Sequence, residues 1–279
     1  MNKIVHTGHA GFIFYLGNIK IVCDHWSSTY RPFSNSWKKL ETDNFSKKIK
    51  FDILNPDYIW CSHAHGDHYD PTYIKKVNKN AKIVIPDFSD NSFYNILKKE
   101  KFKNKIIKLK DKQKLNINKF GYIQIFFEEP SYTNHSSLFI KSERLNIFHN
   151  ADTTINDSFK KKLLKFKDLK KIDYLIGQYT NPTPYPWSIK MSAIKKNKEG
   201  IEMHYNALNS FVNMITDLKP KYALPCAGPA LVEKHKIKSY KKAYDIIYDK
   251  KNNLLYLNNK KKTLTKILNV KSSQEIKIL

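Results

Sequence analysis

Six consecutive residues combine three imidazoles with one carboxylate and are the strongest chemical signal in the chain. They read His63-Ala64-His65-Gly66-Asp67-His68. Neutral imidazoles present nitrogen lone pairs to a metal ion near physiological pH. Because residues two apart in an extended or turning segment can face the same way, His63 and His65 can hold one ion, while Asp67 and His68 point elsewhere and can serve a second. The spacing therefore predicts a centre for two divalent ions.

The residues on either side of this run predict the elements that position it. Asp57–Ser62 is apolar and reads as a buried strand, and Gly66 permits a tight turn. Pro71–Lys79 reads as a short helix with proline in its first turn. We therefore expect the run to lie in a loop at the end of a buried strand.

Other short apolar segments predict two groups of strands, each followed by helices. The expected strands are Ile4–His6, Phe12–Leu16, Ile19–Asp24, Lys82–Pro86, Lys105–Leu109, Gly121–Phe127, Ser137–Lys141, Leu145–His149, Asp173–Gly177 and Tyr222–Pro225. The expected helices are Asp90–Lys101, Ile155–Phe166 and Gly200–Leu218. This order predicts two packed sheets with helices outside, in one domain of residues 1–279. Residues from about 235 to 279 form a lysine-rich extension with a strand-like patch at Leu254–Leu257.

The composition indicates a globular protein with a large positive charge. The 279 residues include 50 Lys+Arg against 25 Asp+Glu, a net charge of +25, and 41% are hydrophobic. Arg31 and Arg144 are the only arginines, whereas sites that read nucleic acid favour arginine. We therefore expect no nucleic-acid partner. The positive field is expected to attract an anionic small molecule.

The sequence also predicts where the protein resides. No apolar run approaches the roughly 18–20 residues of a membrane-spanning helix, and the first residues do not resemble a signal peptide. The three cysteines, Cys23, Cys61 and Cys226, lack the spacing of a disulfide framework. We therefore expect a cytoplasmic protein without a transmembrane segment.

The histidine-rich run after a buried strand resembles the metal-binding signature of the metallo-β-lactamase superfamily. His9–Phe12 and Ile21–Asp24 resemble the opening hairpin of its lactonase and N-acyl-phosphatidylethanolamine phospholipase D-like branch. The resemblance extends from about His6 to Pro229. It implies an α/β fold, the αββα sandwich, in which two mixed β-sheets carry helices on their outer faces and the metals lie at one edge of the sheets.

The same resemblance implies further metal ligands. His135 matches a histidine that completes the first ion's site with His63 and His65, although alone it reads as a loop histidine. Asp152 matches an aspartate that bridges both ions, although alone it reads as a helix N-cap. Asp24 is implied to hydrogen-bond a ligand histidine from outside. The implied cofactors are two ions of Zn²⁺ or Fe²⁺, with Mn²⁺ as a further option.

The sequence departs from the family pattern at the last ligand. That position usually holds a histidine after a late strand, and here Cys226 follows Tyr222–Pro225. We expect Cys226 either to ligate a soft or borderline metal as thiolate or to be a packed thiol. His204 matches a histidine near the metals in the phospholipase D-like branch, so its expected role is proton transfer, against the alternative of a solvated helix histidine. His25, beside Asp24, is expected to reach the site.

Four short segments resemble the metallo-β-lactamase-like half of CMP-N-acetylneuraminate hydroxylase and its bacterial relatives in sugar and surface-polysaccharide pathways. They are Asp24–Trp26, Pro32–Trp37, Tyr185–Trp187 and Pro225–Pro229. The hydroxylase also carries a Rieske iron–sulfur module, which needs two Cys-and-His pairs that this chain lacks. Oxidative chemistry would therefore need an electron-transfer partner.

Two loops are expected to wall the pocket, His25–Trp37 and Pro182–Trp187. Trp26, Trp37 and Trp187 either stack on a sugar or base or pack within their own loops. Arg31 is the expected clamp for a phosphate or carboxylate group of the substrate.

Three hypotheses for function follow. The first is a metal-dependent hydrolase in which Asp67, Asp152 and His204 serve the attack on a phosphoester, lactone or amide. The second is a non-haem di-iron oxygenase acting on a sugar or nucleotide sugar. The third is a non-catalytic binding protein with a degenerate metal site, which the departure at Cys226 motivates.

Overall fold

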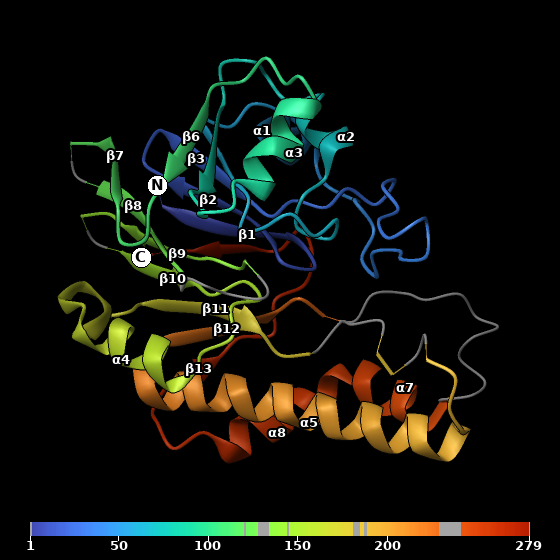
Figure 1. Ribbon diagram of the computed structural model, residues 1–279. Coiled ribbons are helices and arrows are strands. Elements are labelled where there is room, and N and C mark those ends of the chain that lie inside the picture. The colour runs from blue at the N-terminus through green and yellow to red at the C-terminus, as the bar shows by residue number, and fades with distance from the viewer. Residues whose placement is uncertain are drawn as a thin grey trace.

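The computed structural model describes residues 2–119, 121–127, 134–143, 145–180, 185–186, 189–228 and 241–278. Two seven-stranded sheets lie face to face, and helices cover the outer face of each (Figure 1). Each sheet joins an antiparallel half to a parallel half, so both are mixed. The predicted αββα sandwich is confirmed.

The first sheet has the order β14-β1-β2-β3-β4-β5-β6. Its strands are β1 (Lys3–Gly8), β2 (Gly11–Leu16), β3 (Ile19–Cys23), β4 (Tyr58–Trp60), β5 (Lys82–Pro86), β6 (Ile106–Leu109) and β14 (Glu275–Lys277). Helices α1 (Lys47–Leu54), α2 (Pro71–Ile74) and α3 (Ser92–Lys99) pack on its outer face.

The second sheet has the order β13-β12-β11-β10-β9-β8-β7. Its strands are β7 (Lys114–Asn118), β8 (Gly121–Phe126), β9 (Ser137–Lys141), β10 (Asn146–His149), β11 (Tyr174–Gln178), β12 (Tyr222–Cys226) and β13 (Lys266–Ile267). Its outer face is covered by α4 (Asp157–Lys165), α5 (Ala193–Leu218) and α8 (Lys250–Lys260), and α7 (Lys241–Tyr248) packs on α5.

The alternation of side chains along a strand explains why the strands are apolar throughout. In β2, Phe12 and Phe14 face the second sheet, while Ile13 and Tyr15 face the outer helices. All six residues of β2 are buried because both faces of the sheet are covered. This continuous burial gives the loops at the strand ends a well-packed base.

The lysine-rich extension completes both sheets. Strand β14 pairs with β1, with Ile276 opposite Ile4, and β13 pairs with β12, with Ile267 opposite Ala223. The strand predicted at Leu254–Leu257 is wrong, because this segment lies in α8. Leu254 and Leu257 are three residues apart and share the helix face that packs on the second sheet.

Several boundaries differ from the sequence predictions. The helix expected at Pro71–Lys79 ends at Ile74, and α5 begins at Ala193 rather than Gly200. Helix α1 and strand β7 are not predicted by the sequence analysis. Within the described residues, every helix is too short or too polar to cross a bilayer.

Candidate metal centre

The histidine-rich run lies in the loop after β4, at the edge where several parallel strands end. A hydrogen bond from Ser136 Oγ to the Ser62 carbonyl oxygen, 2.8 Å long, ties this loop to the segment before β9. A second link between the sheets runs from His149 Nε2 to the Ala10 carbonyl oxygen at 3.1 Å. Residues of both sheets therefore meet at this edge, as the fold resemblance implies.

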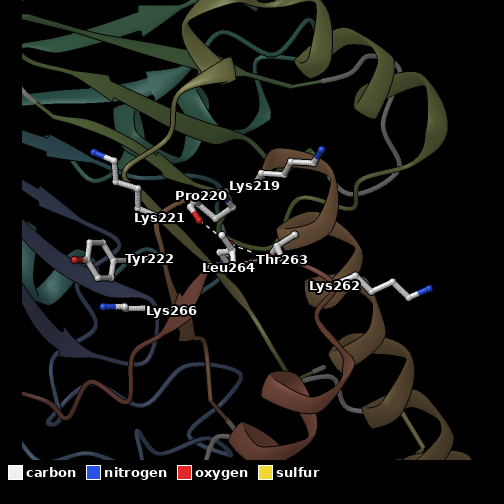
Figure 2. Close-up of a pocket in the computed structure, with 9 residues that line it drawn as sticks. Lys219, Pro220, Lys221, Tyr222, Lys262, Thr263, Leu264 and Lys266 are labelled. Atoms are coloured by element: carbon white, nitrogen blue, oxygen red, sulfur yellow. Dashed lines mark hydrogen bonds between the residues drawn. The ribbon is translucent and has the colours of Figure 1, made fainter.

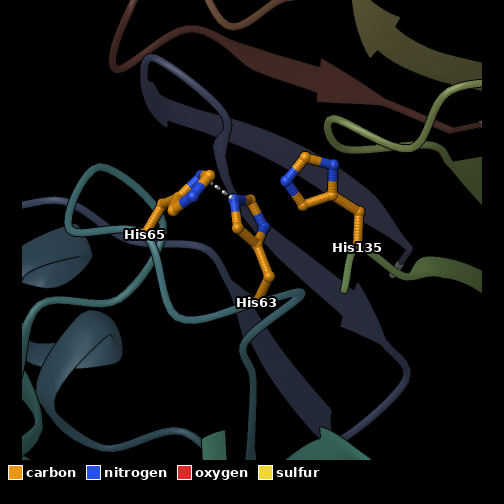
Figure 3. A group of neighbouring side chains, drawn as sticks. All are labelled: His63, His65 and His135. Carbon is orange, nitrogen blue, oxygen red and sulfur yellow. Dashed lines mark hydrogen bonds between the residues drawn. The ribbon is translucent and has the colours of Figure 1, made fainter. Parts of the chain in front are cut away.

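Three imidazoles converge at the centre of this edge. The possible ligand atoms of His63, His65 and His135 all lie within 4.8 Å of one another (Figure 3). His63 Nε2 is 2.9 Å from His65 Nδ1, and His135 Nδ1 is 3.1 Å from the carbonyl oxygen of Asp152. His63 is buried and His65 is exposed, so this triplet opens to solvent on the His65 side.

A second triplet shares His63 and adds His68 and Asp152. His68 Nε2 lies 3.2 Å from Asp152 Oδ2 and 3.7 Å from Asp67 Oδ2. The structure thus brings together, from separate segments, the residues that the resemblance assigns to two neighbouring ions.

A third triplet contains a residue to which the sequence analysis assigns no role. His9 joins Asp67 and His68, and its Nε2 is 3.1 Å from Asp67 Oδ2. His9 lies in the turn between β1 and β2. A histidine between Gly8 and Gly11, in a hairpin expected at the metal edge, is the signal that could have pointed to it.

Asp24 fixes the orientation of His68. Its Oδ2 is 2.8 Å from His68 Nδ1 and accepts a 2.7 Å hydrogen bond from Ser62 Oγ, while Oδ1 accepts one from the Ser62 N–H. A carboxylate can only accept, so the proton of His68 sits on Nδ1. The other ring nitrogen, Nε2, is therefore turned toward Asp67 and Asp152.

Burial and neighbouring charges hold the cluster in a form suited to metal binding. Burial, with help from the imidazoles of His68 and His135, lowers the pKa of His63 well below its usual value. Burial also lowers the pKa of His135 to about 4. Both rings are therefore neutral at pH 7 and present lone pairs.

The carboxylates of the cluster are ionised. Burial alone would raise the pKa of Asp152, but His68 outweighs it and lowers that pKa. The pKa of Asp67 is lowered in the same way by His68 and His9 against the effect of burial. Burial alone would lower the pKa of His68, but Asp152, Asp67 and Asp24 raise it well above the usual value. In the metal-free protein His68 carries the charge that balances the carboxylates.

These donors fit divalent transition metals. Asp67 Oδ1, His135 Nε2 and Asp152 Oδ1 are buried without a hydrogen-bond partner in the described parts of the chain. Buried polar atoms are usually paired, so three such atoms at one place indicate a missing positive partner. Ligand atoms about 2.0–2.2 Å from a zinc ion lie roughly 3.3–3.5 Å from one another in a tetrahedral site. The distances of 2.9 Å between His63 Nε2 and His65 Nδ1 and of 3.2 Å between His68 Nε2 and Asp152 Oδ2 are similar.

Three residues expected at the site lie elsewhere or make other contacts. Among the residues described, Cys226 and His204 belong to none of the triplets. Cys226 ends β12 and is buried, and burial raises the pKa of its thiol well above the usual value.

His204 Nε2 lies 2.9 Å from Asn253 Oδ1, between α5 and α8. His25 Nδ1 contacts Thr7 Oγ1 at 3.1 Å, and its ring packs on Tyr73.

The aromatic loop borders the centre with a different set of residues than expected. Trp26 is fully buried against His9, a position that offers no face to a substrate. Phe33 lies between Trp37 and His65, with ring centres 4.6 and 6.3 Å away. Arg31 Nη1 lies 3.5 Å from the Ser28 carbonyl oxygen of the same loop. Trp187 is outside the described residues, as is most of the Pro182–Trp187 loop.

A separate cavity of about 590 Å³ lies at the other end of β12 (Figure 2). It is lined near the start of this strand by Lys219, Pro220, Lys221, Tyr222, Lys262, Thr263, Leu264, Thr265 and Lys266. Cys226, on the metal side, is the opposite end of the same strand. None of these lining residues is a histidine or an acid, so the cavity has no part in the centre.

No protein-family model matches the sequence. A relative from Mycolicibacterium smegmatis, named as a Rieske 2Fe-2S iron-sulfur protein, is 25% identical over 235 residues. These residues are 81% of this chain and 43% of the relative, so the chain spans less than half of that protein. A Saccharolobus solfataricus protein named as a metal-dependent hydrolase is 22% identical over 238 residues, 77% of this chain and 92% of the relative.

Solved structures share the fold at low sequence identity. An isothiocyanate hydrolase from Delia radicum gut bacteria superposes with a TM-score of 0.65 and 14% identity, covering 99% of each chain. YhfI, a metallo-β-lactamase fold protein from Bacillus subtilis, superposes with a TM-score of 0.57 at 14% sequence identity. The superposition covers 99% of this chain and 98% of YhfI. The diiron β-hydroxylase CmlA from Streptomyces venezuelae superposes with a TM-score of 0.61 at 10% sequence identity. The superposition covers 99% of this chain and 54% of CmlA.

The protein therefore has the metallo-β-lactamase fold, and its structural neighbours include an isothiocyanate hydrolase and a diiron hydroxylase. The lactonase and phospholipase D-like branch and the relation to CMP-N-acetylneuraminate hydroxylase stay predictions.

Proposed function

We propose that this protein is a metal-dependent hydrolase that uses two divalent ions held at the shared edge of its sheets. The observation that carries the proposal is the set of three overlapping triplets, in which three buried oxygen and nitrogen atoms have no partner within the described residues. A structural neighbour named as an isothiocyanate hydrolase and a relative named as a metal-dependent hydrolase support the same class of activity.

The proposed ligands divide between two neighbouring positions. His63, His65 and His135 hold one ion, Asp67 and His68 hold the other, and Asp152 lies between them. Two divalent ions in such a centre supply an activated water and stabilise negative charge on the oxygen of the attacked group.

The chain contributes orientation and access. Asp24 and Ser62 fix His68, and the His135 ring is held by the carbonyl oxygen of Asp152. His65 is exposed, so a substrate reaches the centre from its side, beside Phe33. Because His204 contacts Asn253 instead of the cluster, we assign it no proton transfer.

The proposed substrate is an anionic small molecule carrying a phosphoester, lactone or amide bond. A net charge of +25 raises the local concentration of anions around the protein and speeds their encounter with it.

The proposal is tested by assaying hydrolysis with a panel of chromogenic phosphoesters, lactones and amides. Wild-type protein is expected to turn over at least one member, to lose that activity on chelation, and to regain it with Zn²⁺ or Mn²⁺. His63→Ala should stay inactive at every metal concentration, because His63 belongs to two of the triplets. Turnover that survives complete demetallation would contradict the proposal.

A second candidate is a non-haem di-iron oxygenase that takes electrons from a separate protein. Two observations favour it: the similarity to a diiron β-hydroxylase and the relatives named as Rieske proteins, of which this chain matches less than half. It predicts iron in freshly purified protein and oxygen consumption with a reductant. If His63→Ala changes neither metal content nor any turnover, both proposals fail and a non-catalytic binding role remains.

A further inference from the structure

We propose that His9, in the β1–β2 turn, is a ligand of the second ion and takes the place of the histidine that the end of β12 lacks. The inference rests on the proposed two-metal function and concerns which residues complete it. The sequence alone leaves this position to Cys226 or to no residue.

The His9 ring lies against Asp67 and His68. Its Nε2 is 3.1 Å from Asp67 Oδ2, and its ring centre is 5.7 Å from that of His68. The possible ligand atoms of the three residues lie within 4.8 Å of one another. His9, Asp67 and His68 are all buried, and Asp67 Oδ1 has no hydrogen-bond partner in the described structure. Two imidazoles and a carboxylate at this spacing are a donor set that zinc and iron accept.

The backbone of His9 is hydrogen-bonded to the residue that follows β12. Its carbonyl oxygen accepts a 3.0 Å hydrogen bond from the N–H of Ala227, the residue directly after Cys226. The β1–β2 turn therefore lies against the end of β12, where the fold resemblance implies the last histidine. His9, which follows β1 of the first sheet, therefore lies beside the end of β12, where Cys226 is a buried thiol.

The turn holds the ring in one orientation. His9 has φ of 50°, a left-handed conformation that is uncommon for a residue with a side chain. Its N–H donates to Glu41 Oε2 at 3.3 Å, and Trp26 packs edge-on against the ring at 5.2 Å. The surrounding contacts thus stabilise a strained residue that points at Asp67.

Two variants separate this inference from its alternatives. His9→Gln removes the imidazole, and Cys226→Ala removes the residue that the sequence analysis proposes for the same position. Zinc binding is measured by equilibrium dialysis against a competing chelator, which reports each ion separately. Retention of the first ion shows that a variant is folded.

We expect His9→Gln to keep the first ion and to bind the second about 100-fold more weakly or not at all, while Cys226→Ala binds both like wild type. The opposite result, with the second ion lost only in Cys226→Ala, would overturn the inference, as would unchanged binding in His9→Gln. If wild-type protein binds no second ion, the proposed function itself fails, and this outcome is distinct from the others.

A crystal structure of the zinc-loaded protein distinguishes a ligand from a residue that only positions Asp67. Anomalous scattering at the zinc edge locates both ions. A distance of about 2.0–2.1 Å from zinc to His9 Nε2 is expected for a ligand. A His9 ring that remains hydrogen-bonded to Asp67, with its Nε2 more than about 3 Å from zinc, would overturn the inference.

Discussion

The carboxylate of Asp24 lies 2.8 Å from His68 Nδ1, and neither side chain is exposed to solvent. Asp24 directly follows β3, and His68 lies in the loop after β4, the adjacent parallel strand, which explains how a pair 44 positions apart in sequence comes into contact. The contact turns His68 Nε2 toward the centre, so the affinity of the proposed second metal site depends on a residue that is not itself a proposed ligand.

We predict that Asp24→Asn weakens binding of the second ion by about 10–100-fold, because an amide cannot hold the Nδ1 proton of His68 as a carboxylate does. Competition with a chromogenic chelator measures both affinities. Asp57→Asn is the matched control, since Asp57 accepts a backbone hydrogen bond from Lys20 near the far end of β4. Equal affinity in Asp24→Asn and wild type would contradict the assigned role.

Gly66 is predicted to set how closely the aromatic loop approaches the metal-binding run. A Cβ at position 66 would lie 2.4 Å from Pro32 Cβ, so Gly66→Ala must displace the loop and should lower the free energy of unfolding by about 1–3 kcal/mol. Urea denaturation checks this value. Gly228→Ala is the control, because among the described residues its Cβ would meet Tyr179 alone, at 3.4 Å. A Gly66→Ala protein as stable as wild type would show that the loop does not pack there.

His25 is predicted to make stability depend on pH. Burial, and then Lys39, lower the pKa of His25 to about 4, against the raising effects of Asp43 and Asp70. In the unfolded chain the value is about 6.5, so between these values the unfolded state binds more protons. Above about pH 6.5 His25 is neutral in both states and does not lower the free energy of unfolding. As the pH falls below this value, the unfolded chain takes up the proton first, and the free energy of unfolding decreases, by about 2 kcal/mol at pH 5.

The variant His25→Phe isolates this effect, because phenylalanine keeps a ring against Tyr73 and does not titrate. The free energy of unfolding is measured in urea at pH 7 and pH 5 for both proteins. Wild type should lose about 2 kcal/mol more than the variant between the two pH values. An identical loss in both proteins would refute the assignment.

The C-terminal strand is predicted to protect the edge of the first sheet. Deleting residues 274–279 removes β14 and leaves β1 without its neighbour, which should lower the urea midpoint and promote association through the bare edge. Size-exclusion chromatography with light scattering detects the association. Lys277→Ala, at an exposed position of the same strand, should change neither property. A truncated protein that keeps the wild-type midpoint and mass would argue against this role.

Much of the fold was predictable because strands buried on both faces are apolar along their whole length. The strands at Phe12–Leu16 and Lys82–Pro86 were located within about a residue for this reason. The run from His63 to His68 was equally visible, since neighbouring ligands in sequence need no knowledge of the tertiary structure.

Features that depend on distant contacts were not predictable. His9 contacts Asp67 across 58 positions, and its place between Gly8 and Gly11 does not state which side chain its ring meets. The aromatic character of Trp26 does not reveal whether the ring is buried or exposed. Leu254–Leu257 is too short for its period to separate a strand from one turn of helix, and packing on the second sheet selected the helix.

The central claim, a two-metal centre built around His63, is tested most directly by elemental analysis of protein purified without added metal. We predict about two divalent ions per wild-type chain and fewer than one in His63→Ala. Zinc would favour the hydrolase and iron the oxygenase. A wild-type protein that holds no metal and takes up none when Zn²⁺ or Fe²⁺ is supplied, or a His63→Ala protein with unchanged metal content, would contradict the claim.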